Sequence, residues 1–172
     1  MIDRIYRLLM VRRIFPSFHY DRDIWRANKV RNSWLTHEDT ETAGFVDSAE
    51  WEEVKENGDD AIDNWVDEQM QNTSVTTVLI GEETHSRKWV NREIEKSVEK
   101  NKGIVGIYIH NLEDRDGNTC SRGTNPLSSH YATVNGNRLS LSSIYNTYNW
   151  VTDDGYDNLG DWVEEAATTA GR

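Results

Sequence analysis

Several residue types and patterns on which common protein functions depend are scarce or missing in this chain. Cys120 is the single cysteine among 172 residues, so neither an intramolecular disulfide nor a thiolate metal cluster can form. The five histidines include no pair four residues apart and no HExxH motif, which argues against the usual zinc sites. Neither GxGxxG nor GxxxxGK[ST] occurs, so the glycine turns that hold dinucleotide cofactors and nucleoside triphosphates are missing. We therefore expect no metal and no resident cofactor.

Positive charge and long apolar runs are also scarce. Nineteen Lys and Arg stand against thirty Asp and Glu, a formal net charge of -11, which argues against nucleic acid as a partner. The opening segment MIDRIYRLLMV is broken by Arg4 and Arg7 and is too short to span a bilayer or to serve as a signal peptide. We therefore expect a cytoplasmic protein without a membrane partner. The length predicts one domain, over residues 10–172, after an N-terminal extension of residues 1–9.

Apolar segments and helical patterns alternate along the chain. Strands are predicted at residues 12–18, 45–47, 74–81 and 103–109, and helices at 23–34, 49–71 with a division at Gly58, 86–100 and 156–167. This alternation is typical of an α/β fold, a flavodoxin-like doubly wound, mostly parallel sheet with helices on both faces. Pro16 lies inside the first strand, where we expect a bulge or a local loss of pairing. Residues 111–137 predict a long loop, followed by a short last strand at Leu139 and Leu141.

Ligands of doubly wound sheets bind in the crevice beyond the carboxyl ends of the strands. This rule selects residues 17–23, 47–51 and 81–89 and the loop that begins at His110. These segments combine polar and aromatic side chains, which suit a nucleoside-like ligand. They supply most of the candidate substrate-binding residues: Phe18, His19, Tyr20, Asp47, Trp51, Ser86 and Trp89.

Glu93 is the candidate catalytic residue. It follows Trp89 by four residues, so both lie on one face of the predicted helix, and Val90 and Ile94 belong to the apolar stripe beside it. Glu93 can therefore reach the rim of the crevice while Trp89 shields it. The residues alone leave a second interpretation open, in which Glu93 belongs to a solvated, charged helix surface.

Asp21 and Asp23 follow the first strand and invite comparison with metal-dependent phosphotransfer enzymes. The DxD phosphatase motif requires Thr or Val where this chain has Trp25. We therefore interpret both carboxylates as solvated acids at a helix N-terminus, where the helix dipole favours negative charge.

The pattern Ser86-x-x-Trp89-x-x-x-Glu93-Ile94, after a buried strand that ends in Gly81, resembles the catalytic helix of TIR domains that cleave NAD. The resemblance also includes RRIFPSFHYDRD, KVRNSW, TSVTTVLIGEETHSRKWVNREIEKSVEKNKGIVGIYIHNLEDRDG, NPL and LSSIYNTYNWVTDDGYDNLGDWV. Across nearly the whole chain from Met10, the sequence is similar to the TIR-like proteins of bacterial and archaeal Thoeris anti-phage systems.

This resemblance implies an enzyme that responds to phage infection by converting NAD, its substrate, into a cyclic or modified ADP-ribose signal. The signal would activate a separate Thoeris effector protein. Glu93 matches the catalytic glutamate, Phe18, His19 and Tyr20 fall where the first strand meets the nucleotide, and Ser86 and Trp89 flank the catalytic helix. TIR domains also act through self-association, which implies a homo-oligomer on activation and leaves a non-catalytic interaction module as the alternative function.

Overall fold

A five-stranded parallel sheet forms the centre of the computed structural model, which describes residues 12–36, 41–42 and 48–172. The strand order is β2-β1-β3-β4-β7, and every neighbouring pair is parallel. The strands are β1 (Arg13–Ser17), β2 (Glu41–Thr42), β3 (Val75–Ile80), β4 (Gly103–Tyr108) and β7 (Thr147–Asn149). This is the flavodoxin-like order, which changes direction between β1 and β3. The predicted fold class is confirmed.

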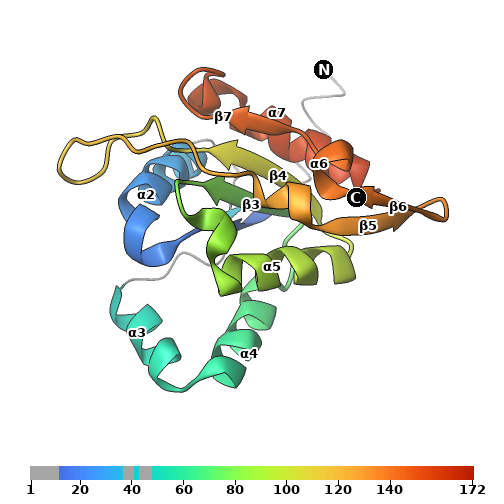
Figure 1. Cartoon of the computed structure of the whole chain (residues 1–172), viewed down its shortest axis with the longest axis horizontal. Coiled ribbons are helices and arrows are strands. Elements are labelled where there is room, and N and C mark those ends of the chain that lie inside the picture. The colour runs from blue at the N-terminus through green and yellow to red at the C-terminus, as the bar shows by residue number, and fades with distance from the viewer. Residues whose placement is uncertain (1–11, 37–40, 43–47) are drawn as a thin grey trace.

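Helices cover both faces of this sheet. On one face lie α2 (Tyr20–Thr36) and α7 (Gly155–Thr169), and on the other lies α5 (Lys88–Glu99), as Figure 1 shows. All residues of β3 are buried, because a parallel strand with helices on both sides has no solvated face. Its side chains alternate accordingly: Val75 and Leu79 pack toward α2 and α7, and Val78 and Ile80 pack toward α5.

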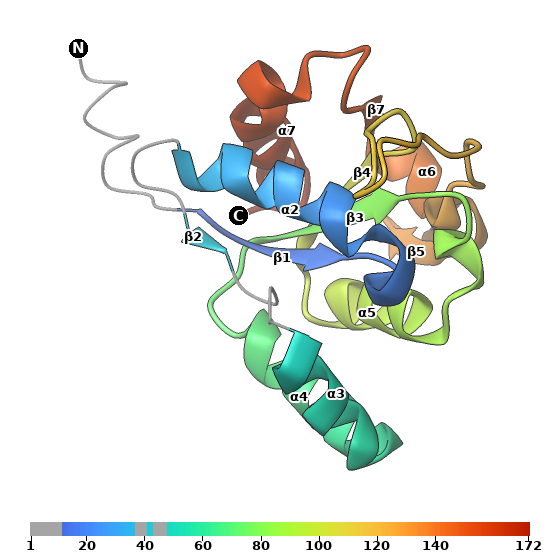
Figure 2. The ribbon, with the colours of Figure 1, turned by 90° about the vertical axis from the view of Figure 1, so that its left-hand side faces the viewer.

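Two further helices, α3 (Ser48–Glu56) and α4 (Asp59–Met70), lie on the α5 side and extend away from the sheet (Figure 2). Gly58 separates them with a φ of +88°, a conformation that glycine adopts without steric cost, so the predicted division at this residue is confirmed. Ion pairs join α4 to α5: Lys96 Nζ lies 2.8 Å from Asp67 and 3.0 Å from Asp63. Lys96 is therefore buried between the helices and is not part of a solvated surface.

The second half of the chain departs from the predictions in two places. Residues 111–137 are not only loop, because they contain the 3-10 turn Pro126–Ser129 and the strand β5 (Tyr131–Val134). Leu139 lies in β6 (Asn137–Ser140), which pairs with β5 in a separate hairpin, and Leu141 begins α6 (Leu141–Ile144). The last strand of the main sheet is β7, which we did not predict because three partly buried residues at a sheet edge carry no apolar run.

The prediction of a bulge or a local loss of pairing at Pro16 is wrong on the β3 side of β1. Pairing of β1 with β3 runs without a break from Ile14 to Ser17, while the described pairing with β2 stops at Ile14. The predicted strand at 45–47 and the extension 1–9 lie outside the described residues. Within the described ranges, no helix has both the length and the apolar character needed to cross a membrane.

Candidate active site

Glu93 lies in the second turn of α5 with its side chain turned toward the end of β1. Its flanking residues in the apolar stripe, Val90 and Ile94, anchor α5 on the sheet, and Glu93 itself is only 7% exposed. The hydroxyl of Ser17, the wholly buried last residue of β1, donates a hydrogen bond to Glu93 Oε2. Ser17 thereby fixes the orientation of this carboxyl group.

The environment of Glu93 changes its acidity. Burial raises its pKa from 4.5 to about 8, and the hydrogen bond from Ser17 works in the opposite direction. Burial disfavours the charged form because the interior solvates charge poorly, whereas a hydroxyl donor favours it. A titratable group with this perturbation, placed at a cavity, is characteristic of a functional site.

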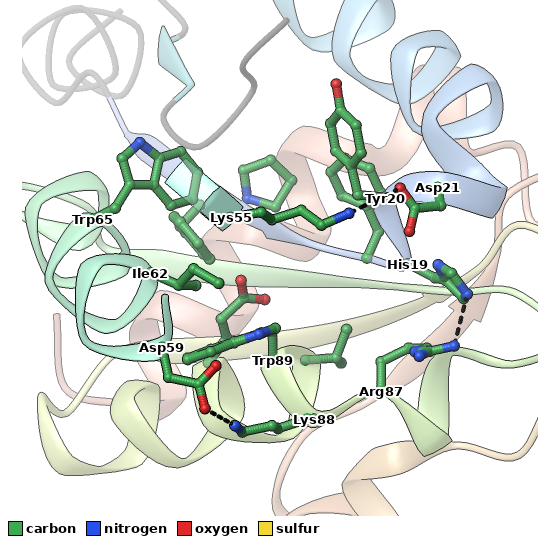
Figure 3. A pocket seen from close by; sticks show the side chains of 15 residues that line it. His19, Tyr20, Asp21, Lys55, Asp59, Ile62, Trp65, Arg87, Lys88 and Trp89 are labelled. Atoms are coloured by element: carbon green, nitrogen blue, oxygen red, sulfur yellow. Dashed lines mark hydrogen bonds and ion pairs between the residues drawn. The ribbon is translucent and has the colours of Figure 1, made fainter. Parts of the chain in front are cut away.

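Glu93 lines a cavity of about 480 Å³ between β1, α4 and α5, within the range of about 300–1,000 Å³ of ligand pockets. Aromatic side chains from β1, α2, α4 and α5 form much of its wall, and Figure 3 shows Trp65 of α4 and Trp89 of α5 among them. Trp89 packs against the cluster that contains Phe15 and Ile62. The rings of Phe18 and Tyr20 stack with centroids 6.0 Å apart.

Charged side chains line the rest of this pocket. Lys55 Nζ lies 3.8 Å from Asp21, and Lys88 pairs with Asp59. Arg87 Nη1 lies 3.1 Å from His19 Nε2 at one end of the pocket, across from Trp65 and Ile62 in Figure 3. Arg87 is also the N-cap of α5, so the positive end of the helix dipole adds to the charge there.

His19 is 9% exposed. Burial lowers its pKa, and the charge of Arg87 lowers it further, against the opposing charges of Asp23, Asp21 and Glu83. At neutral pH the imidazole is therefore uncharged. Since the guanidinium of Arg87 can only donate, Nε2 of His19 is the acceptor and the ring proton is on Nδ1.

The structure brings most of the candidate residues together. Phe18, His19, Tyr20, Trp89 and Glu93 all line the pocket. Ser86 does not: it is exposed, and its hydroxyl donates to the carbonyl of Glu83 at 2.9 Å. Asp47 lies outside the described residues, and Trp51 lies in α3 with its side chain outside them.

Other residues of the site were not named as candidates: Lys55, Trp65 and Arg87 line the pocket, and Ser17 holds Glu93. Ser17, Lys55, Trp65 and Arg87 gave no local signal of a site, because each becomes important only through residues distant in the sequence. Ser17 and Glu93 are 76 positions apart, and His19 and Arg87 are 68 apart. The one usable sign was position, since Ser17 lies in the selected segment 17–23 and Arg87 in the selected segment 81–89.

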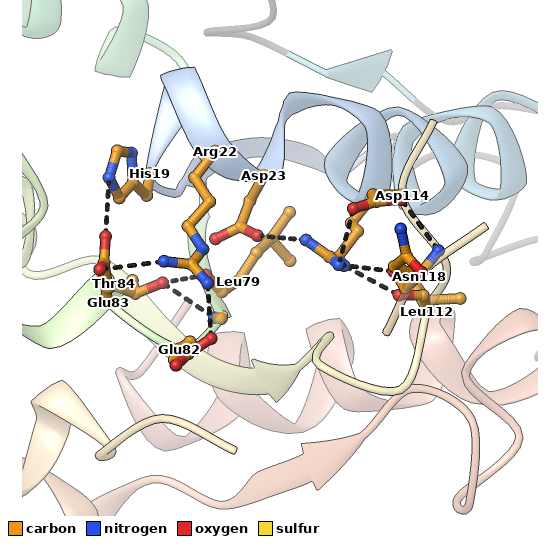
Figure 4. A network of polar contacts seen from close by, with 12 residues as sticks. His19, Arg22, Asp23, Leu79, Glu82, Glu83, Thr84, Leu112, Asp114 and Asn118 are labelled. Atoms are coloured by element: carbon orange, nitrogen blue, oxygen red, sulfur yellow. Dashed lines mark hydrogen bonds and ion pairs between the residues drawn. The ribbon is translucent and has the colours of Figure 1, made fainter. Parts of the chain in front are cut away.

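The prediction that Asp23 is solvated is wrong. Its side chain is 0% exposed, and Arg26 Nη1 lies 3.0 Å from Asp23 Oδ1. Arg26 also donates to the carbonyls of Leu112 and Asn118, both at 2.8 Å. Figure 4 shows Asp23 between the Glu82–Thr84 turn and the loop that carries Leu112, Asp114 and Asn118. Asp21, in contrast, is exposed as predicted.

No group of three or more His, Cys, Asp or Glu side chains in the described part of the chain is arranged to hold a metal ion. The groups that this site offers for chemistry are the buried carboxyl group of Glu93, the hydroxyl of Ser17 that orients it, the aromatic walls and the guanidinium of Arg87 at one end. Such a set can bind a ligand with rings and charge and can stabilise positive charge that develops beside Glu93.

Comparison with known proteins yields two matches. Residues 15–114 match the family described as "Thoeris protein ThsB, TIR-like domain", a segment that contains Ser17, His19, Arg87 and Glu93. The chain is also similar to the "Putative cyclic ADP-D-ribose synthase ThsB1" of Bacillus cereus (strain MSX-D12). The two are 37% identical over 191 residues, which cover 90% of this chain and 100% of that protein.

Proposed function

This chain belongs to the Thoeris ThsB family of TIR-like proteins, and on that basis we propose that it is a signalling enzyme of anti-phage defence. It cleaves NAD at the bond between nicotinamide and ribose and closes the remaining ADP-ribose into a cyclic second messenger. The observation that carries this proposal is the carboxyl group of Glu93, buried in a pocket lined by aromatic rings and oriented by Ser17. NAD is the substrate, and no resident cofactor is needed.

Cleavage places positive charge on the sugar. The bond between C1′ of the ribose and the ring nitrogen breaks, nicotinamide leaves with the electron pair, and the ribose acquires oxocarbenium character, as in glycoside hydrolysis. A carboxylate beside the ring stabilises that charge and accepts hydrogen bonds from the ribose hydroxyls. Because the nicotinamide ring is already cationic, it needs no proton in order to leave. One carboxylate, Glu93, is therefore enough.

Cyclisation requires a nucleophile of the same molecule to reach C1′ before water does. Formation of the new bond from an adenine nitrogen or a ribose hydroxyl to C1′ completes the ring and moves the positive charge from the sugar to the attacking group, which then releases a proton to water. A pocket that aligns the attacking group and excludes water favours this outcome over hydrolysis. The rings of Phe18, Tyr20 and Trp89 are placed to hold the bases by stacking.

Activity is expected to follow the ionisation of Glu93. The pKa of Glu93 is raised to about 8, so the group is protonated in the unliganded protein at lower pH. The value of kcat/KM reports ionisation of the free enzyme. We expect kcat/KM for NAD to rise about tenfold per pH unit between pH 6 and 7.5 and to level off above pH 8. Burial and the charge of Arg87 lower the pKa of His19, which moves its titration away from that of Glu93. Steady-state nicotinamide release by the purified protein measures this profile.

Removal of the Ser17 hydroxyl provides the test of this assignment. In Ser17→Ala the carboxylate loses a donor that favours its charged form, so the midpoint should move to higher pH and kcat/KM at pH 7 should fall about tenfold. Thr77→Val is the matched control, because it removes a buried hydroxyl of the adjacent strand that has no hydrogen-bond partner among the residues described. An identical midpoint in Ser17→Ala and wild type would show that Glu93 does not set the profile.

The signal requires a receiver, and we propose a separate Thoeris effector protein in this role. The family supports this pairing, as it supports the formation of a homo-oligomer on activation. We place the enzyme in the cytoplasm with both its substrate and its effector.

Mass spectrometry of nucleotides from phage-infected cells tests the proposed function. Cells that express the chain should accumulate free nicotinamide and an ADP-ribose-derived species on infection, and infected cells without the chain should not. The mass and fragmentation of that species identify a cyclic product. The same nucleotide content in both cultures, while the expressing cells resist phage, would contradict the enzymatic proposal.

A further inference from the structure

Arg87 differs from the other cations that line the pocket. Lys55 lies within 3.8 Å of both Asp21 and Glu52, and Lys88 pairs with Asp59. Among the described residues, no carboxylate lies within ion-pair distance of Arg87, whose nearest polar partner is the imidazole of His19. In a chain with thirty acidic residues against nineteen basic ones, an arginine at the end of a pocket that forms no ion pair with the described carboxylates is available to an anionic ligand.

The contact with His19 prepares the guanidinium for such a ligand. His19 accepts through Nε2 from Nη1 of Arg87 at 3.1 Å and is uncharged, so it orients the arginine without neutralising it. A guanidinium has five N–H donors in one plane, and pairs of them match two oxygens of a phosphate group. The interaction with His19 uses one side of this plane and leaves further donors for the ligand.

Once Glu93 is ionised, as catalysis requires, the pocket is polarised along α5, with positive charge at Arg87 and negative charge at Glu93. Glu93 lies six residues after Arg87 on the same helix, about 9 Å along its axis. NAD has a matching distribution of charge: a cationic nicotinamide at one end and, beyond the attached ribose, an anionic diphosphate. The opposite orientation would place the diphosphate beside the carboxyl group of Glu93.

We infer that Arg87, held by His19, binds the diphosphate of NAD and so sets the direction in which the nucleotide enters, with the nicotinamide riboside at Glu93. This inference rests on the proposed function. It makes Arg87 a substrate-binding residue for the ADP portion, distinct from Glu93, which acts on the bond that breaks.

Binding of ADP-ribose, which has the diphosphate but no scissile bond, tests the inference without catalysis. By isothermal titration calorimetry, Arg87→Ala should weaken ADP-ribose binding about 10- to 100-fold, the value of a charge-assisted hydrogen bond, and should leave adenosine binding unchanged. Arg115→Ala is the matched control, because it removes the same charge from an exposed loop position outside the pocket. Equal affinity of wild type and Arg87→Ala for ADP-ribose, or wild-type binding no tighter than that of adenosine, would overturn the inference.

Kinetics supply the second measurement. Arg87→Ala should raise KM for NAD by about the same factor with kcat changed by less than about threefold, since the diphosphate is bound alike in the ground and transition states. Cleavage of nicotinamide riboside, which lacks phosphate, should be unaffected. An equal loss on both substrates would overturn the inference in favour of a structural role. If no NAD cleavage occurs and ADP-ribose binding still depends on Arg87, the proposed function fails and the subsite stands.

Discussion

Replacement of Glu93 by Gln is expected to reduce NAD cleavage by about a thousandfold, the loss typical of removing a group that stabilises transition-state charge. Gln has nearly the same shape and retains an oxygen that accepts from Ser17, but it carries no negative charge at any pH. Nicotinamide release by purified protein and the ADP-ribose species in infected cells are the two measurements. The substitution should abolish nicotinamide release and the ADP-ribose species together.

Glu95→Gln is the matched control for this substitution. It makes the same chemical change two residues away on α5, at a side chain that is 53% exposed and outside the pocket, so activity should remain within about twofold of wild type. Unchanged phage defence in Glu93→Gln would instead support the alternative function, a TIR-like interaction module without chemistry. Loss of defence together with loss of the product supports the enzyme.

The fold of Glu93→Gln should be intact, and the pH dependence of its stability gives an independent check. A carboxyl group with a pKa raised to about 8 in the folded state binds its proton more tightly there than in the unfolded chain. The folded state therefore loses stability as pH rises from about 4.5 to about 8. The variant lacks this titration, so at pH 8 and above it should be at least as stable as wild type in urea unfolding.

Replacement of Arg26 by Ala is expected to lower the free energy of unfolding by about 3–5 kcal/mol, the typical cost of leaving one charge of a buried pair without its partner. The side chains of Asp23 and Arg26 are 0% and 3% exposed. Oδ2 of Asp23 has no hydrogen-bond partner in the described part of the chain, and burial already raises the pKa of this carboxyl group. Without Arg26 the carbonyls of Leu112 and Asn118 also lose their donors.

Urea denaturation at pH 7 measures this loss, with Arg115→Ala as a control that should change stability by less than about 0.5 kcal/mol. The deficit of Arg26→Ala should shrink as pH falls, because Asp23 is then protonated and no longer presents an isolated charge. A double variant with Asp23→Asn should recover part of the loss at pH 7. A loss below about 1 kcal/mol for Arg26→Ala would mean that water reaches Asp23 and that the pair does not hold the loop.

The sequence was most informative where one short segment specified its own environment. The continuous apolar runs around Val78 and Ile107 predicted buried parallel strands, and Gly58 divided two helices as expected. The interval from Trp89 to Glu93 placed both on the pocket side of one helix. Elements at the edge of the sheet were harder to predict. The strand β7 forms by pairing with β4, and its own residues carry no strand pattern.

The sequence by itself therefore determined the alternation of strands and helices. This alternation also determined that the candidate residues gather at the carboxyl ends of the strands. Only the tertiary structure decided their chemistry. Parallel strands joined by helical crossovers bring distant segments together at the carboxyl ends of the strands. For this reason Ser17 contacts Glu93, His19 contacts Arg87, and Arg26 contacts Leu112 and Asn118. Acidity and charge pairing depend on burial and on neighbours in space. Local spacing encodes neither, and so Asp23 was predicted as solvated, and Arg87 was not named as a candidate although the selected segment 81–89 contains it.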